Sequence, residues 1–386
     1  MRGHIRERSP GHWAIVLDVR DPASGKRRRK WHSFAGTKRA AQAECGRLIS
    51  ELQSGMSLDP SRVTVAAYLK RWLDHVRSQV SPRTLEVYGE TIARITPFIG
   101  AISLLKLRPA EIAAMHAAAL ERGGQAGRGF SARTVHMMHR LIAQALKQAV
   151  KWQLLARNPC DAVSPPRVER RQMEVLDADA AAALMEAARG HVLFMPILLG
   201  VLCGLRRGEV AALCWRNVDL DAGRLSIVAS LEQTNGGHVR IKPPKSGRPR
   251  TVALPALAIE ELHRYRLTQA EELLRLGIRQ SDETRVCLQS NYRPWAPRSL
   301  SSFFAIFVKA AGLPHVRLHD LRHSHATHLL MANVHPKVVQ ERLGHSSITT
   351  TVDTYSHVMP GIQDEAASRI DAALRTALSQ RRKTKG

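Results

Sequence analysis

The sequence predicts a multidomain, mainly α-helical protein with small β-sheets. Its 386 residues exceed what one hydrophobic core usually organises, so more than one domain is expected. Alternating apolar residues near the N-terminus predict strands, and apolar residues at helical spacing dominate after Val63. Beyond residue 175 helical and strand-like runs are mixed, which predicts an α+β domain.

The charge balance predicts a polyanionic partner. Lysine and arginine total 58 against 33 aspartates and glutamates, a formal net charge of +25. Nucleic-acid-binding proteins carry such an excess, so we expect double-stranded DNA as the partner. The alternative is a basic protein without a nucleic-acid partner.

Cysteine usage and hydropathy indicate a soluble, cytoplasmic protein. The five cysteines are odd in number, scattered and without C-x-x-C spacing, so neither a disulfide framework nor a zinc ribbon is expected. No run reaches the 18 apolar residues of a membrane span, and the N-terminus lacks the apolar core of a signal peptide. No membrane contact is expected.

Residues 1–57 are predicted to form a small β-hairpin or sheet plus a helix. HWAIVLDVR and KWHSF are the strand-like runs, and the helix that follows begins after Thr37 and stops at Gly55. This segment holds 12 basic and 5 acidic residues, a net charge of +7. A basic β-ribbon can enter a major groove, although a solvated turn that aids solubility is the alternative. The candidate DNA contacts on the hairpin are Arg27, Arg28, Arg29 and Lys30.

Residues 62–162 are predicted to form a bundle of four helices. Apolar stripes recur at helical spacing, Ser81-Pro82 begins the second helix, and Ser131 caps the last and longest one. Trp72 and Trp152 are expected in the core. The candidate phosphate contacts are Arg83, Arg133 and Arg140, together with Arg94 and Lys147.

The segment 163–174, VSPPRVERRQME, has no apolar rhythm and is predicted to be a linker to the third domain at 175–386. In that domain an almost wholly apolar helix stops at Gly204, so the arginines after it can face a cleft. Three strand-like runs follow, RLSIVASLE, HVRIK and RTVALP, and a hairpin tip between the last two presents Lys245.

Phosphodiester chemistry needs the residue types that this domain offers. The charge on the non-bridging oxygens must be neutralised, and the departing oxygen must be protonated. Arginine forms paired, permanently charged hydrogen bonds to phosphate, and lysine can act as the acid. Tyrosine can become the nucleophile with help from its surroundings. The residues that fit these roles, in chain order, are Arg206, Lys245, His319, Arg322, His345 and Tyr355.

These residues stand in the motifs GLRRGE, PKSGR, HDLRHSHAT, LGH and DTYSH, in an order that resembles the tyrosine recombinases, specifically phage and conjugative-element integrases. The upstream hairpin plus helix and the bundle look like that family's arm-type and core-type DNA-binding domains. The resemblance therefore covers nearly the whole chain and implies a mixed α+β tyrosine recombinase catalytic domain. It also implies a site-specific recombinase that acts through a 3′-phosphotyrosyl intermediate and a Holliday junction.

The resemblance also assigns a role to each residue. Tyr355 attacks the scissile phosphate, Lys245 protonates the leaving 5′-oxygen, and His319 assists proton transfer at the tyrosine. The phosphoryl oxygens are held by Arg206, Arg322 and His345. Bond energy is conserved in the protein–DNA ester, so neither a nucleotide cofactor nor a metal is expected, and GxxxxGK[ST] is absent. Metal binding by the four histidines of the HDLRHSHATH segment is the alternative.

Two choices in this assignment rest on the motifs. Lys245 is preferred to Lys242 because PKSG fits the family's lysine turn better, and Arg206 is preferred to Arg207 by the GLR register. Glu209 is interpreted as a buried carboxylate that orients an arginine.

The C-terminal region carries two further expectations. β-Branched residues in SSITTTVDTY lower helix propensity, which predicts that the segment carrying Tyr355 is loosely held. The final amphipathic helix either folds back or, as in relatives, packs onto a neighbouring protomer, and the resemblance implies a homo-tetramer on DNA. Accessory DNA-bending or excisionase proteins are further partners that it implies.

Two other functions stay open. One is a topoisomerase-like enzyme with the same tyrosine chemistry, which relaxes supercoils without paired sites. The other is a DNA-binding regulator with this fold that does not cut, which a missing tyrosine or arginine would have favoured.

Overall fold

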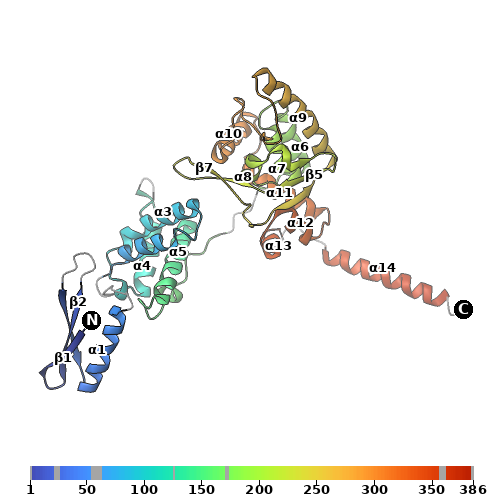
Figure 1. The fold of residues 1–386 in the computed structure, drawn as a ribbon. Helices are drawn as coiled ribbons and strands as arrows, with labels where there is room; N and C mark the ends of the chain where they lie inside the picture. The colour runs from blue at the N-terminus through green and yellow to red at the C-terminus, as the bar shows by residue number, and fades with distance from the viewer. Residues whose placement is uncertain are drawn as a thin grey trace. The chain divides into compact units, whose positions relative to one another are not determined.

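The computed structural model describes residues 2–20, 27–53, 63–124, 127–169, 174–355 and 362–383. It is mostly helical with small antiparallel sheets, as the sequence predicts (Figure 1). The chain divides into two compact units, residues 1–168 and 169–386. None of the helices in the described ranges is long and apolar enough to cross a membrane.

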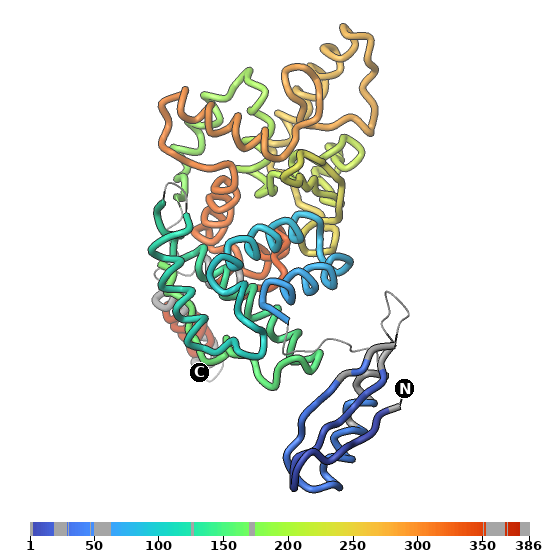
Figure 2. The backbone as a smooth tube through the Cα atoms, turned by 90° about the vertical axis from the view of Figure 1, so that its left-hand side faces the viewer, coloured from blue at the N-terminus to red at the C-terminus, as the bar shows by residue number. Residues whose placement is uncertain are grey.

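The first unit begins with an antiparallel sheet of three strands in sequence order (Figure 2). The elements are β1 (Arg2–Ser9), β2 (His12–Arg20), β3 (Arg27–Ala35) and helix α1 (Lys38–Gln53). Ile15 and Leu17 of β2 pack with Cys45 of α1, and the Thr37 hydroxyl accepts the Ala40 N–H, as expected of a cap. Gly55 lies outside the described residues.

The sequence interpretation found only two of these three strands. β1 was missed because RGHIRERS has a single large apolar residue, Ile5, among charged neighbours. Cross-strand pairing to the central strand, rather than an apolar pattern, makes this segment a strand: Ile5 lies opposite Ile15. The basic tract lies on β3, where Arg29 pairs with Asp18 of β2.

Among the described residues between 63 and 168, four α-helices form a bundle, as predicted. They are α2 (Val65–Val76), α3 (Pro82–Ile99), α4 (Pro109–Glu121) and α5 (Ala132–Lys151). Ser81 and Ser131 cap α3 and α5, each accepting a backbone N–H in the first helical turn. Trp72 is buried in the core between the helices, whereas Trp152 is half-buried at its edge.

The second unit surrounds one strongly apolar helix, α7 (Phe194–Cys203), which packs against α11 (Leu318–Met331). The other helices are α6 (Ala178–Ala187), α8 (Arg207–Ala212), α9 (Ala256–Arg275), α10 (Pro297–Ala310), α12 (Pro336–Leu343), α13 (Ile348–Tyr355) and α14 (Ile362–Lys383). The strands are β4 (Val218–Asp219), β5 (Arg224–Ile227), β6 (Ser230–Gln233), β7 (Val239–Lys242) and β8 (Arg250–Ala253).

The strands of this unit correct two predictions. RLSIVASLE is not one strand, because the chain leaves β5 after Ile227 and enters β6, which belongs to another sheet. The Lys245 turn is not a hairpin tip either, since β7 pairs with β6 whereas β8 pairs with β5. Sequence alternation marks strands but does not say which strands pair, so both errors have the same cause.

Candidate active site

Arg322 is the most deeply buried of the predicted site residues. It lies on α11 with 1% of its surface exposed and donates to the carbonyls of Gly204 at 2.6 Å and Leu343 at 2.5 Å. These carbonyls belong to the ends of α7 and α12. A Cβ atom at Gly204, whose φ is +65°, would lie 2.6 Å from the His325 ring, so only glycine allows this close approach.

Arg206 stands at the start of α8 and is held by Glu209. The carboxylate accepts from the Arg206 backbone N–H at 2.9 Å and from its Nη1 at 2.9 Å, and it also accepts two hydrogen bonds from Arg250. Burial would raise the pKa of Glu209, but the hydrogen bonds and charge of Arg250 and the charge of Arg206 lower it to about 2. The interpretation of Glu209 as a buried carboxylate that orients an arginine is confirmed.

The last turn of α12 brings the arginines together. Three consecutive carbonyls there each accept from a different arginine: Arg342 O from Arg250 Nε at 2.9 Å, Leu343 O from Arg322 Nη2 at 2.5 Å, and Gly344 O from Arg206 Nη2 at 3.0 Å. The last carbonyls of a helix lack intrahelical partners and carry partial negative charge, so cations are stable there. We call this set of contacts the three-arginine cap.

His345 directly follows the cap. Its Nδ1 lies 2.8 Å from the hydroxyl of Thr351, a fully buried residue of α13. Desolvation and then the charges of Arg322 and Arg206 lower the pKa of His345 to about 3. The ring is therefore neutral at pH 7.

His319 lies three residues before Arg322 on α11. Its ring meets that of His323 edge to face, with 4.9 Å between ring centroids. Desolvation and then His323, Arg322 and Arg206 lower the pKa of His319, although the side chain is exposed on the surface. The same arginines thus act on both His319 and His345, and the structure brings Arg206, Arg322, His319 and His345 into one region.

The motifs favour Lys245 over Lys242 and Arg206 over Arg207, and the contacts of these side chains differ. Lys242 forms an ion pair with the buried Glu232 at 2.5 Å, whereas Lys245 is exposed in its turn and has no side-chain partner among the described residues. Arg207 points to Ser301 of α10 on the surface. These contacts favour Lys245 and Arg206 for a phosphate.

Tyr355 is the last residue of α13, and its side chain lies outside the described part of the chain. The segment forms a helix despite its β-branched residues. Burial of Thr351 and its contact with His345 offset the low propensity, because tertiary contacts can outweigh helix propensity. The loosely held segment stays a prediction.

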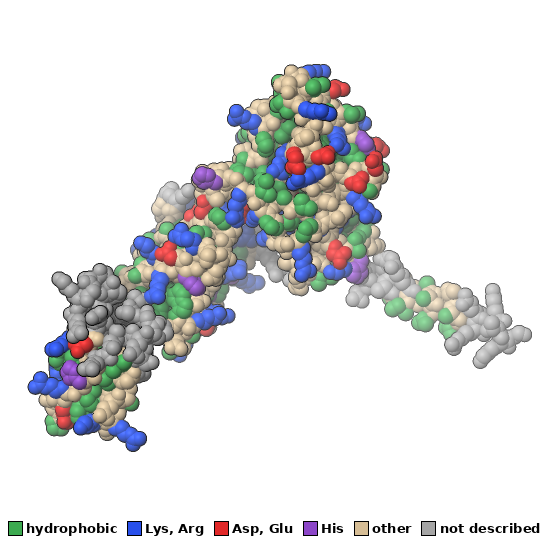
Figure 3. Space-filling view, viewed as in Figure 1, with side chains coloured by type: hydrophobic (Ala, Val, Ile, Leu, Met, Phe, Trp, Pro, Cys, Tyr) green, Lys and Arg blue, Asp and Glu red, His purple; other side chains and the backbone are tan. Residues whose placement is uncertain are grey.

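The candidate DNA contacts differ in their availability. Arg133, Arg140 and Lys147 are exposed on α5 at intervals of seven residues, so the three line one face of the helix. Arg83 is paired with Glu86 at 3.0 Å. Arg29 contacts Asp18 at 3.3 Å, and the side chains of Arg27, Arg28 and Lys30 lie outside the described part. Basic side chains are spread over the visible face of both units (Figure 3).

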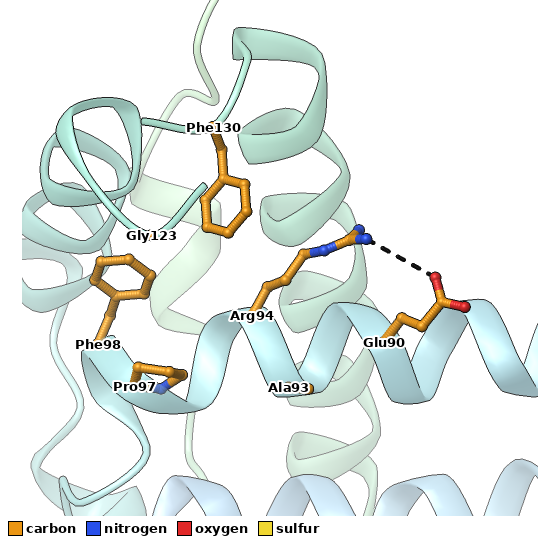
Figure 4. A pocket seen from close by; sticks show the side chains of 7 residues that line it. All are labelled: Glu90, Ala93, Arg94, Pro97, Phe98, Gly123 and Phe130. Carbon is orange, nitrogen blue, oxygen red and sulfur yellow. Dashed lines mark ion pairs between the residues drawn. The ribbon is translucent and has the colours of Figure 1, made fainter. Parts of the chain in front are cut away.

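A cleft of about 380 Å³ lies in the helical bundle and contains none of the predicted catalytic residues. Phe98 and Phe130 line it, and Arg94 lies near Glu90 at its edge (Figure 4). No group of three or more His, Cys, Asp or Glu side chains is placed to hold a metal ion within the described ranges.

Three residues of the site were missed from the sequence: Arg250, Arg342 and Thr351. Arg342 donates from Nε to His325 Nε2 at 3.0 Å and from its Nη atoms to two backbone carbonyls. Arg250 begins the strand directly after the lysine turn, and this position was the available signal. The carboxylate and carbonyl partners of Arg250 and Arg342 lie 41 to 140 residues away in the chain, so spacing alone could not reveal them.

Comparison with known proteins places the chain in a family. Residues 174–361 match the model of the phage integrase family, and residues 64–116 match the phage integrase N-terminal SAM-like domain. The ICEBs1 integrase of Bacillus subtilis is 30% identical over 248 residues, which span 64% of this chain and 67% of that protein. The chain belongs to the phage integrase family.

Three further similarities extend along most of this integrase-family chain. A tyrosine recombinase XerC-like protein of Caldanaerobacter subterraneus is 25% identical over 93% of this chain and 96% of its own. The Tn1549 transposon integrase, solved with a circular intermediate DNA, has a TM-score of 0.69 at 18% identity and covers 80% of this chain and 99% of its own. A lambda integrase tetramer bound to a Holliday junction has a TM-score of 0.55 at 22% identity, covering 89% and 96%.

Proposed function

We propose that this chain is a site-specific DNA recombinase that cleaves and rejoins strands through a 3′-phosphotyrosyl intermediate and a Holliday junction. The observation that carries this proposal is the three-arginine cap, which gathers Arg206 and Arg322 at the helix end that precedes His345. It lies within the residues that match the phage integrase family. DNA is therefore the substrate.

In this mechanism Arg206 and Arg322 neutralise the non-bridging oxygens of the scissile phosphate. Their carbonyl and carboxylate partners fix the guanidinium groups before DNA arrives, so little reorganisation is needed in the transition state. A neutral His345 keeps one N–H. With the Thr351 hydroxyl donating to Nδ1, the N–H on Nε2 binds a phosphoryl oxygen.

The covalent step transfers the phosphoryl group from DNA to protein. The Tyr355 oxygen forms a bond to phosphorus, the bond to the 5′-oxygen breaks, and Lys245 gives that oxygen a proton. His319, neutral at pH 7 because its pKa is lowered, assists removal of the tyrosine proton. The reverse reaction with another 5′-hydroxyl rejoins the strand, so the ester itself supplies the energy and no nucleotide cofactor is consumed.

The other parts of the chain have DNA-binding and assembly roles in this proposal. Residues 1–57 form the arm-type domain and residues 62–162 the core-type domain, with the stripe of Arg133, Arg140 and Lys147 facing phosphates. Residues 163–174 are the linker, and residues 175–386 are the catalytic domain with its C-terminal helix. The active assembly is a homo-tetramer on paired DNA sites, assisted by DNA-bending or excisionase proteins, in the cytoplasm.

The test is incubation with nicked suicide DNA that carries a candidate attachment site, followed by denaturing electrophoresis. We expect a covalent protein–DNA adduct that disappears in Tyr355→Phe while DNA binding persists. Absence of an adduct, with binding intact, would favour the non-cutting regulator. Relaxation of supercoiled plasmid lacking paired sites would instead favour the topoisomerase-like enzyme.

A further inference from the structure

Arg250 takes part in the site although no catalytic role was assigned to it. Its guanidinium reaches Glu209 with both Nη atoms, at 2.9 and 2.7 Å, and reaches the Arg342 carbonyl with Nε at 2.9 Å. Only 8% of the side chain is exposed. A paired contact of this kind fixes both position and orientation, because the planar guanidinium matches the carboxylate.

These contacts join elements that are distant in the chain. Glu209 is on α8 and holds Arg206, whereas Arg342 is in the last turn of α12, three residues before His345. Arg250 itself begins β8, five residues after Lys245. One side chain therefore connects the segment of the lysine with those of the first arginine and the histidine.

The hydrogen bonds of Arg250 separate its role from that of Arg206. Arg250 uses Nε and both Nη atoms within the protein, whereas Arg206 contacts Glu209 and Gly344 through its two Nη atoms and has 19% of its side chain exposed. We propose that Arg250 is a positioning residue that holds the Glu209 carboxylate and the end of α12 in one arrangement, so that Arg206 and His345 are fixed before DNA binds.

This inference rests on the proposed function, and its consequence can be separated from general stability by pH. The charged groups acting on Glu209 are Arg250 and Arg206, and His345 lies beyond them. Without Arg250, Glu209 stays buried but loses two hydrogen bonds and one countercharge. Its pKa must then rise, so the fraction of ionised Glu209, and with it the alignment of Arg206, falls as the pH is lowered.

The experiment measures single-turnover adduct formation on nicked suicide DNA at saturating protein, from pH 5 to pH 8. Arg250→Gln should slow the adduct roughly 10- to 100-fold, as misplacement of catalytic groups does, with a DNA Kd within about twofold of wild type. The rate of adduct formation by Arg250→Gln should also fall as the pH is lowered, which the wild-type rate should not do. The double variant Arg250→Gln with Glu209→Gln should lose that pH dependence, because the amide that replaces the carboxylate cannot titrate.

The matched control is Arg264→Gln. Arg264 donates to Glu261, another buried carboxylate that bonds two arginines, at 2.6 Å, yet it lies on α9 outside the cap. It should leave the adduct rate within about twofold of wild type, the change expected for a surface ion pair. Arg250→Lys keeps the charge without the planar pair and should fall between Arg250→Gln and wild type.

The outcomes distinguish failure of the proposed function from failure of the positioning role of Arg250. If wild type forms no adduct, the proposed function fails. If wild type forms an adduct and Arg250→Gln or Arg250→Lys reacts as fast as Arg264→Gln, the role of Arg250 is wrong. A slower rate with an unchanged pH profile would also overturn it, because the effect would not pass through Glu209. If Arg250→Gln does not fold, the comparison of Arg250→Lys with Arg264→Gln decides.

Discussion

Two buried glutamates of the second unit differ in the exposure and contacts of the arginines that they bind. Glu209 and Glu261 are 2% and 6% exposed, and each bonds two arginines. Around Glu209 the arginine side chains are 19% and 8% exposed, and around Glu261 they are 50% and 64% exposed. A buried ion pair therefore does not by itself mark an active site.

The two pairs of arginines differ in what they bind besides Glu209 or Glu261. Arg206 and Arg250 continue from Glu209 to two carbonyls at the end of α12, beside His345. Arg189 and Arg264 have carboxylates as their hydrogen-bond partners and extend into solvent. The first region is a fixed cationic site, whereas the second ties surface helices together.

The largest expected difference is between the adduct rates of the Arg206→Ala and Arg189→Ala variants. Arg206→Ala should lower the rate of adduct formation about 10²- to 10³-fold, because one fixed donor to the transition state is lost. Arg189→Ala removes the equivalent partner of Glu261 and should leave the rate near that of wild type. Single-turnover assays at saturating protein measure both rates, and equal rates for the two variants would show that Arg206 has no special role in cleavage.

The lysines extend the comparison to a third buried carboxylate, Glu232. Lys245→Ala should slow cleavage about 10²-fold, as expected for loss of a general acid. Lys242→Ala, which removes an ion-pair partner of Glu232, should have a much smaller effect. DNA with sulfur in place of the 5′-leaving oxygen needs no proton on departure, so it should restore cleavage by Lys245→Ala. Failure of that rescue, or a larger defect in Lys242→Ala, would reverse the assignment.

Substitution of the two glutamates should have similar effects on stability but different effects on activity. Glu209→Gln should slow adduct formation roughly tenfold or more and should also lower the free energy of unfolding by about 1–3 kcal/mol, because its arginines lose a charged partner. Glu261→Gln should lower stability by a similar amount with no change in the adduct rate. Chemical denaturation and the adduct assay, run on the same preparations, give both quantities.

The expected effect most remote from catalysis is in the acid dependence of stability. His345 has a lowered pKa, so the unfolded chain binds a proton below about pH 6.5 that the folded chain does not bind until about pH 3. Stability should therefore fall as the pH drops through this range, by at most about 1.4 kcal/mol per pH unit from this group. His345→Asn should reduce the slope, and His263→Asn, an exposed change on α9, should not. Equal slopes in both variants would show that the cap does not control this histidine.

The site was more predictable from sequence than the strand pairing was. Arg206, Arg322 and His345 could be found because short motifs preserve their order, and Glu209 because it stands three residues after Arg206 on the same helix face. The strand β1 could not, since its side chains lack an apolar pattern. Arg250 and Arg342 were missed for a different reason: backbone carbonyls, which any residue can supply, are among their partners, and their side-chain partners Glu209 and His325 are not marked by local spacing. The helical state of α13 was hidden by its β-branched residues, whose burial only the folded chain shows.

We propose that guanidinium groups at the end of α12 neutralise the phosphate that Tyr355 attacks. The most direct test places a methylphosphonate, which lacks the negative charge, at the mapped cleavage position. With that substrate Arg206→Ala should regain at least about tenfold of its lost adduct rate, because no charge remains to be neutralised, and Tyr355→Phe should form no adduct. An Arg206→Ala defect of equal size on both substrates would show that Arg206 does not neutralise the phosphate.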